Sequence, residues 1–272
     1  MPAPSQVTSV LCLLLCLSGV VQASPLAKSA LEASPVDDIV ARYPAMMSEG
    51  VRRGLSQGGI TDPMVVTTVA AVVGNALRAE DIQAELVSDL SVSMSDNQLR
   101  TVRGWYETPL AEKIARAEIA ASGPETWEKI EAGAADLQAR FRGSERAALF
   151  SRYDRAARAT EGAVDTTVAV QLGLATAVSV FRGSGESGFA KLKQMIESRR
   201  QQTRAMVAQQ VYDIYLYTYR DLSVDELRDY IGFLETDAGA KFTRVVTASL
   251  QDSITRPLAT VGRQLARFLA PF

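Results

Sequence analysis

The residue types that perform most protein chemistry are scarce in this chain. The sequence contains no histidine, and its two cysteines, Cys12 and Cys16, both precede residue 24. Histidine is the commonest general base and metal ligand, and cysteine is the other frequent nucleophile and zinc ligand. Beyond residue 23 the composition therefore excludes His-dependent triads, cysteine proteases and ordinary zinc sites. We predict no catalytic residue, no metal and no cofactor.

Two glutamates each stand six residues before a lysine, Glu107 before Lys113 and Glu235 before Lys241. A glutamate with a helper lysine could perform acid–base hydrolysis, but that chemistry usually needs a second carboxylate, and the sequence offers no evident one. We favour an ion pair or a backbone cap that braces the chain at this point.

Three glycines, Gly183, Gly185 and Gly188, have the spacing of the dinucleotide-binding fingerprint, in which the backbone approaches a pyrophosphate at a helix N-terminus. That fingerprint also requires a second strand with an acidic end about 20 residues later. Residues 199–210 are instead basic to polar and helical in character. We therefore interpret 182–188 as a flexible loop.

Three tyrosines, Tyr212, Tyr215 and Tyr219, fall on one face of a predicted helix. An aromatic stripe could line a groove for a lipid, a glycan or a peptide, because rings stack on a ligand while hydroxyl groups bind its polar atoms. Packing in the core or against another subunit is the favoured alternative. The stripe is nevertheless our candidate ligand or partner face.

These side chains must be positioned by helices, because every strong periodic signal in the chain is helical. Residues 94–116 and 222–244 each predict a helix, a sharp corner and a second helix. Ser95 with Gln98, and Ser223 with Glu226, have the spacing of capping boxes that start the first helix of each pair. After the corner, Thr108 and Thr236 are predicted N-caps.

The two segments match at a constant offset of 128 residues, and this gapless relation indicates a duplication. The matched pairs are Ser95/Ser223, Leu99/Leu227, Arg100/Arg228, Gly104/Gly232, Glu107/Glu235, Thr108/Thr236, Lys113/Lys241 and Arg116/Arg244. Glycine costs about 1 kcal/mol relative to alanine inside a helix. We therefore expect a close approach of helices at Gly104 and Gly232.

The second segment resembles the signature of the bacterial domain of unknown function 2059 family, L-[ST]-x-x-E-L-x-x-x-x-x-F-[YL]-x-[ST]-x-x-G-x-K-[FL]. It carries Leu222, Ser223, Glu226, Leu227, Phe233, Thr236, Gly239, Lys241 and Phe242. The first segment keeps Ser95, Leu99, Trp105, Thr108 and Lys113, but has Gln98 and Ala111 in place of the signature glutamate and glycine. The resemblance implies a secreted, all-helical envelope protein. It supplies no catalytic residues, because the function of the family is not established.

A second pair of related segments, 67–76 and 166–175, precedes the corners at an offset of 99 residues. The corners are 128 apart, so the second half should carry 29 extra residues (128 − 99), which places an insertion near 182–210. The nearly uncharged segment 64–77 is predicted to be a buried central helix, although its valines leave a strand possible. A single long amphipathic helix is predicted over 189–221.

Prolines suggest two further boundaries. Pro44 is predicted to interrupt the helix that follows Asp37, because proline lacks an N–H group and clashes with the preceding turn. Pro257 is predicted to start the final helix, since proline is favoured at the first helical position.

The N-terminal residues 1–23 have the pattern of a secretory signal peptide. An apolar run from Val10 to Val21 is too short to span a bilayer, and Val21-Gln22-Ala23 suits cleavage after Ala23. No lysine or arginine precedes the run. A lipoprotein site at Cys16 is disfavoured because leucine precedes it. We predict a flexible leader over 24–36 and two helical repeats over 37–143 and 144–272.

The net charge of −2 and a pI near 5.5 make nucleic acid an unsuitable partner. A chain of this length can bury a sufficient core without disulfides. We predict an all-α bundle of two divergent tandem repeats, located in the periplasm and without a transmembrane span in the mature chain. Its expected role is a non-enzymatic interaction or structural module that binds another envelope protein. The alternative is a periplasmic carrier or sensor of an apolar ligand.

Overall fold

A computed structural model describes residues 24–57, 59, 61–181 and 185–269 of the chain. All elements in these ranges are α-helices, which confirms the predicted all-α class. Their bounds are α1 (Pro25–Ala33), α2 (Pro35–Gln57), α3 (Pro63–Ala76), α4 (Ala79–Ser93), α5 (Asp96–Tyr106), α6 (Pro109–Ser122), α7 (Pro124–Phe141), α8 (Glu145–Ala157), α9 (Ala159–Phe181), α10 (Gly185–Ser198), α11 (Arg200–Thr218), α12 (Val224–Leu234) and α13 (Asp237–Leu269). The predicted signal peptide lies outside the described residues.

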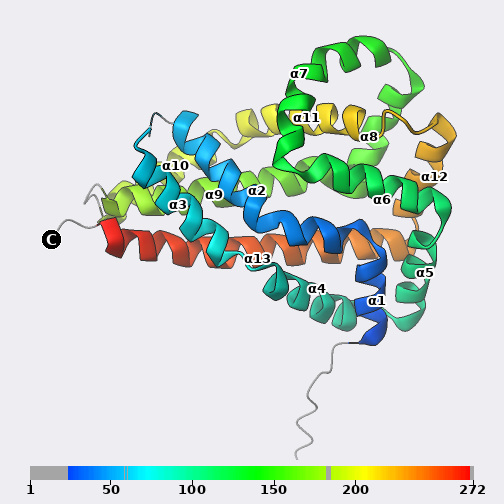
Figure 1. The fold of residues 1–272 in the computed structure, drawn as a ribbon, viewed down its shortest axis with the longest axis horizontal. Coiled ribbons are helices and arrows are strands. Elements are labelled where there is room, and N and C mark those ends of the chain that lie inside the picture. The colour runs from blue at the N-terminus through cyan, green and yellow to red at the C-terminus, as the bar shows by residue number, and fades with distance from the viewer. Residues whose placement is uncertain (1–23, 58, 60, 182–184, 270–272) are drawn as a thin grey trace, which may run out of the picture.

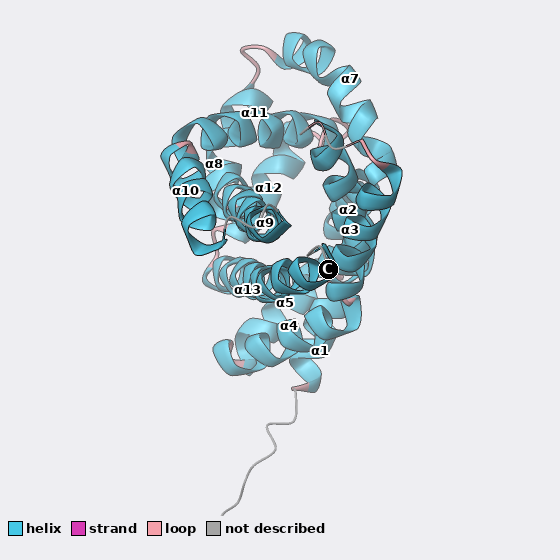
Figure 2. Ribbon diagram, turned by 90° about the vertical axis from the view of Figure 1, so that its left-hand side faces the viewer, coloured by secondary structure: helices cyan, strands magenta, loops and turns pink. Residues whose placement is uncertain are grey.

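The long helix α13 runs the length of the molecule and packs against α9 (Figure 1). In the view along this direction, α2, α9, α11 and α13 surround the centre of the molecule, while α1, α4 and α5 lie on the far side of α13 (Figure 2). The largest hydrophobic core draws on both predicted halves, with Leu99 and Val102 from one and Leu227 and Tyr230 from the other. The two halves therefore share one core.

Both predicted corner segments form. The capping boxes at Ser95 and Ser223 start α5 and α12 as expected, because in each box the serine oxygen accepts from a backbone N–H and the side chain three residues later accepts in return. The segments also meet each other. Trp105 stacks on Phe233 with ring centroids 4.6 Å apart and an angle of 8° between the planes. These two residues are related by the offset of 128, although the duplication itself stays a prediction.

The predicted flexible leader is instead the helix α1. Ala27, Ala30 and Leu31 are fully buried in the largest core, where α1 packs on α5, α4 and α2. The prediction is wrong because the alanines of this segment pack in the core, which composition alone does not reveal. Their small side chains let α1 approach its neighbours closely.

Two predicted boundaries at prolines are wrong. Helix α2 continues through Pro44, and α13 continues through Pro257. Proline removes one backbone hydrogen bond from a helix. In α2 the burial of Val40, Val51 and Leu55 along its length offsets that loss.

Two of the predicted helices form but differ from their predicted burial or length. The segment 64–77 forms α3, but only Val69, Ala70 and Val73 within that helix are buried and Met64 is 78% exposed, so α3 lies at the surface. The helix predicted over 189–221 is divided at Arg199 into α10 and α11, both of which pack on α9. Helix α10 lies within the predicted insertion. Gly185 and Gly188 are part of this helix, so the predicted flexible loop is wrong at 185–188, and residues 182–184 lie outside the described residues.

The close helix approach expected at Gly104 and Gly232 is absent, since a Cβ atom at either position would meet nothing within 4 Å. Among the glycines of these segments, Gly239 is the one where a close contact leaves no space for a side chain. A Cβ atom there would lie 2.1 Å from the carbonyl oxygen of Phe233. In the ranges that the structure describes, no helix combines the length and apolar character needed to cross a bilayer.

Candidate functional site

The main candidate site is a cavity of about 420 Å³, a volume typical of small-molecule sites. Its wall comes mainly from α2, α6, α7, α8, α11, α12 and α13. Aliphatic and aromatic side chains dominate the lining, and no lysine or arginine belongs to it in the described part of the chain. Among the described residues of the lining, Glu118 on α6 carries the only carboxyl side chain.

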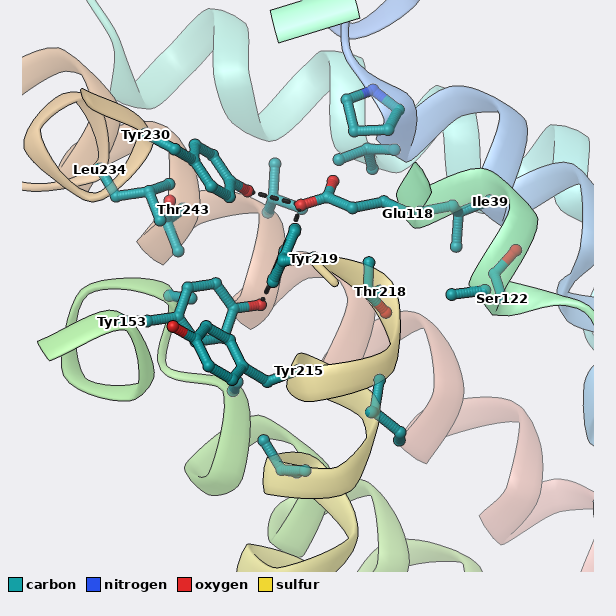
Figure 3. A pocket seen from close by; sticks show the side chains of 18 of the residues that line it. Ile39, Glu118, Ser122, Tyr153, Tyr215, Thr218, Tyr219, Tyr230, Leu234 and Thr243 are labelled. Carbon is teal, nitrogen blue, oxygen red and sulfur yellow. Dashed lines mark hydrogen bonds between the residues drawn. The ribbon is translucent and has the colours of Figure 1, made fainter. Parts of the chain in front are cut away.

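Glu118 accepts two hydrogen bonds on the same carboxylate oxygen. The Tyr219 hydroxyl donates to Oε1 at 2.6 Å, and the Tyr230 hydroxyl donates to it at 2.7 Å (Figure 3). The Tyr219 and Tyr153 hydroxyl oxygens are 3.1 Å apart. Since the single proton of Tyr219 is directed at Glu118, Tyr153 must be the donor in that contact. The three phenols therefore form a hydrogen-bonded network that ends at one carboxyl group.

The aromatic rings beside Glu118 support one another. Tyr153 lies 5.4 Å from Tyr219 in an edge-on arrangement, and Tyr219 lies 5.9 Å from Tyr230 in the same manner, as measured between ring centroids. Tyr215 packs on Tyr153 at 5.1 Å, and its hydroxyl donates to the backbone carbonyl of Arg146 at 2.9 Å. Edge-to-face contacts of this kind add to the energy of burial. They hold the rings in a fixed geometry around the carboxyl group.

The protein environment raises the pKa of Glu118. Removal from water disfavours its charged form and is the dominant cause, while the hydrogen bonds from Tyr219 and Tyr230 act in the opposite direction. Burial likewise raises the pKa values of Tyr219 and Tyr230 well above the ordinary value, and it raises the pKa of Tyr215 to about 12. The phenols accordingly remain protonated donors at neutral pH.

Two polar atoms of the cavity wall have no partner within the described residues. The second carboxylate oxygen of Glu118, Oε2, receives no hydrogen bond from the described residues and points away from both hydroxyl groups (Figure 3), but it is not a buried atom, because Glu118 is partly exposed. The hydroxyl of Thr218 is buried and unpartnered, and Thr218 is only 8% exposed. Buried polar groups are normally hydrogen-bonded. The wall therefore offers unused hydrogen-bonding capacity to a guest.

Glu118 is not among the predicted site residues, although the sequence contains a signal for it. On the buried face of α6, Glu118 follows Ile114 by four residues and precedes Ala121 by three, so a carboxylate stands in an otherwise apolar stripe. An acidic side chain on a core-facing helical stripe needs a buried partner or a function. Tyr153 and Tyr230 were also outside our predicted site.

The predicted tyrosine face is divided between core and cavity. Tyr215 and Tyr219 are buried, which agrees with core packing, and they also line the cavity, which agrees with a ligand face. Tyr212 is only partly buried and packs on Phe150 instead, with centroids 4.9 Å apart. The stripe thus contributes two of its three residues to the candidate site.

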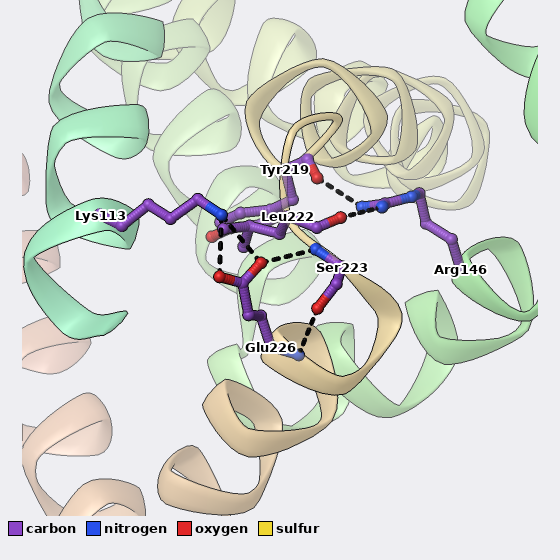
Figure 4. A network of polar contacts seen from close by, with 6 residues as sticks. All are labelled: Lys113, Arg146, Tyr219, Leu222, Ser223 and Glu226. Carbon is purple, nitrogen blue, oxygen red and sulfur yellow. Dashed lines mark hydrogen bonds and ion pairs between the residues drawn. The ribbon is translucent and has the colours of Figure 1, made fainter. Parts of the chain in front are cut away.

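The end of α11 that carries Tyr219 is fixed by a buried arginine. Arg146 of α8 donates through its guanidinium group to the backbone carbonyls of Tyr219 and Leu222, beyond the last turn of α11 (Figure 4). Carbonyls at a helix C-terminus lack partners within the helix, and a cation there also complements the helix dipole. Arg146 therefore positions Tyr219 relative to Glu118.

The predicted Glu/Lys pairs do not form within the segments. Lys113 donates to both carboxylate oxygens of Glu226, at 2.8 Å and 2.9 Å, and so links α6 to α12 (Figure 4). Glu107 binds Arg103 at 2.7 Å, and Glu235 forms a bidentate pair with Arg152. None of these pairs lines the cavity. A spacing of six residues places the two side chains of each predicted pair on different sides of the corner.

The remaining signature residues are structural. Leu99, Leu227, Phe233 and Phe242 are core residues, and Thr108 and Thr236 cap α6 and α13 through hydroxyl groups that accept from backbone N–H groups. The described residues contain no cluster of acidic side chains arranged to hold a metal ion.

Comparison of the chain with protein-family models, with curated proteins and with solved structures finds no match. The resemblance to the domain of unknown function 2059 family therefore stays a prediction that rests on the signature residues.

Proposed function

We propose that this chain is a non-enzymatic binding protein of the bacterial envelope that holds a small, mainly apolar molecule in the cavity beside Glu118. The observation that carries the proposal is a cavity of about 420 Å³ whose wall is aromatic and aliphatic, with a few converging polar groups. That combination is the usual character of a ligand site. It favours the carrier or sensor over the interaction module that we first expected from the sequence.

In this proposal, the chain binds its ligand in the periplasm after the signal peptide has been cleaved behind Ala23. Support comes from the apolar run and the small residues before the predicted cleavage site. Helix α1 begins at Pro25, so cleavage there would leave every described helix intact. The intact mass of the protein from a periplasmic fraction should correspond to a chain that begins at Ser24. A full-length mass, or recovery in the cytoplasmic fraction, would contradict this part of the proposal.

Native mass spectrometry tests the cavity directly. Protein purified from its own cells without detergent should carry an additional small-molecule mass that denaturation releases. Ala157→Leu adds a branched side chain to the cavity wall and should abolish that mass. Ala148→Leu is the matched control, since Ala148 lies on the same helix, is exposed and does not line the cavity.

Three results would contradict the proposal. One is a bare chain mass for the wild type together with failure to bind apolar probes of cavity size. Another is a bound mass that persists unchanged in Ala157→Leu. Recovery of a stoichiometric protein partner whose binding is insensitive to Ala157→Leu would instead return the interaction module to first place.

A further inference from the structure

Among the described residues, the cavity wall contains one acid, Glu118, and no base. The groups that face Glu118 include Tyr106 from α5, Tyr153 from α8, Tyr219 directly after α11 and Tyr230 from α12. The lining residues from α2 and α13 are apolar or carry hydroxyl groups, and none of them titrates near neutral pH. In the described part of the chain, nothing in the wall neutralises an ionised Glu118.

The hydrogen bonds around Glu118 are arranged for a negative charge. The hydroxyl groups of Tyr219 and Tyr230 donate to Oε1, and the hydroxyl group of Tyr153 donates to that of Tyr219. Donors aimed at one oxygen stabilise the ionised form. Oε2 stays without a donor within the described residues. A guest that brings a positive charge and an N–H donor would complete this arrangement.

The hydroxyl groups of Tyr219 and Tyr230 occupy Oε1 and leave Oε2 to a ligand. Tyr219, Tyr230 and Tyr153 lie together on one side of the Glu118 carboxylate (Figure 3). Much of the remaining wall, including Ile39, Ile130 and Val246, is apolar and suits a hydrocarbon body.

We infer that the ligand of this cavity is an amphiphilic organic cation, an amine with an apolar body, whose ammonium group binds Oε2 of the Glu118 carboxylate. This inference rests on the proposed function and specifies the chemical class of its ligand. The charge on Glu118 selects the amine, while the apolar wall selects its hydrocarbon body.

A matched pair of probes separates the two contributions. Titration calorimetry compares n-octylammonium with n-octanol, which has the same hydrocarbon chain and no charge, on the wild type and on Glu118→Gln. The glutamine keeps an oxygen to accept from Tyr219 and Tyr230 and is nearly the same size. We expect the wild type to bind octylammonium at least about tenfold more tightly than octanol, equivalent to about 1.4 kcal/mol. Glu118→Gln should lose this preference and bind octanol about as well as the wild type.

The affinity for octylammonium should also depend on pH. Ionised Glu118 is the form that pairs with an ammonium group, and burial raises the pKa of this carboxyl group. Affinity should therefore rise with pH, by at most about tenfold per pH unit below the pKa of the free protein. The affinity of Glu118→Gln should not change over the same range.

The possible failures are distinguishable. Equal affinity of the wild type for the amine and the alcohol, or equal affinity of the wild type and Glu118→Gln for the amine, would overturn the cation and leave an apolar cavity in place. Binding of neither probe to the wild type, with no effect of Ala157→Leu on a co-purified mass, would overturn the proposed function itself.

Discussion

At the scale of single residues, Glu118 makes the stability of the fold depend on pH. Its pKa is raised in the folded protein, chiefly by burial. Between the ordinary carboxyl pKa and this raised value, the folded chain holds a proton on Glu118 that the unfolded chain has released. The contribution of Glu118 to the free energy of unfolding is fully present below the ordinary carboxyl pKa. It is lost as the pH rises through the raised pKa of the folded protein.

Glu118→Gln should remove this dependence. The glutamine cannot ionise, so the variant should become more stable than the wild type as the pH rises, with the difference growing by at most about 1.4 kcal/mol per pH unit. Urea unfolding followed by circular dichroism between about pH 5 and about pH 8 measures the difference. A constant offset between the two proteins over this range would show that Glu118 does not titrate differently in the folded and unfolded chain.

Gly239 leads to a second prediction at the scale of single residues, and this one concerns packing. A Cβ atom there would lie 2.1 Å from the Phe233 carbonyl oxygen and 3.1 Å from the Thr236 hydroxyl, so Gly239→Ala must displace backbone at the corner. We expect a loss of at least about 2 kcal/mol in the free energy of unfolding. At the matched position of the other corner, Ala111 tolerates a side chain, and Ala111→Gly should cost about 1 kcal/mol through helix propensity. Equal losses in urea unfolding would contradict this difference between the corners.

At the scale of elements, the pair of Lys113 and Glu226 connects α6 to the start of α12. The hydrogen bond from Lys113, and then that from the Ser223 backbone, lower the pKa of Glu226. The stabilisation is therefore present above the ordinary carboxyl pKa and is lost as the pH falls through the lowered one. Both side chains are partly exposed, 41% for Lys113 and 31% for Glu226, so solvent screens the interaction.

A double-mutant cycle with Lys113→Met and Glu226→Gln should give a coupling free energy below about 1 kcal/mol at neutral pH. The glutamine keeps the capping box, because Gln98 fills the equivalent role in α5. Repeating the cycle at a pH below the lowered pKa should reduce the coupling toward zero. A coupling that is unchanged at low pH would mean that the contact does not depend on the charge of Glu226.

At the scale of the whole molecule, the N-terminal helix α1 is part of the cooperative core. Leu31 is 1% exposed, and α1 contacts α2, α4 and α5. Leu31→Ala should lower the free energy of unfolding by about 2 to 5 kcal/mol, because it removes buried methyl groups and leaves a cavity. Glu32→Ala is the control on the exposed side of the same helix and should change it by less than about 0.5 kcal/mol.

Urea unfolding with a single cooperative transition is the measurement for both variants. If Leu31→Ala were as stable as the wild type, α1 would be a dispensable extension, as the sequence first suggested. If it lowered the stability in a separate early transition, α1 would unfold independently of the main core.

The features that the sequence predicted well depend on short-range rules. The capping boxes at Ser95 and Ser223 require residues only three positions apart, and the helices follow from apolar periodicity. The low helix propensity of proline ends neither α2 at Pro44 nor α13 at Pro257, and propensity is a weak guide that tertiary context can override.

The candidate site was not predictable in the same way. Glu118 receives its partners from Tyr219 and Tyr230, which are 101 and 112 positions away in the chain. Helical spacing correctly grouped Tyr215 with Tyr219, but periodicity does not tell which element a stripe will face. Lys113 likewise binds Glu226, 113 positions away, and not the nearer Glu107. Long-range pairing of this kind depends on how helices pack, which one sequence does not specify.

Trp127 gives the cavity a built-in optical reporter. This indole lines the cavity wall under the guanidinium group of Arg53, 5.3 Å from the ring centroid, whereas Trp105, the other tryptophan of the chain, is stacked on Phe233 outside the cavity. A molecule that fills the cavity would change the surroundings of one indole and leave those of the other alone. Ultraviolet emission from the unlabelled protein could therefore be used to screen extracts of its native cells for the natural guest.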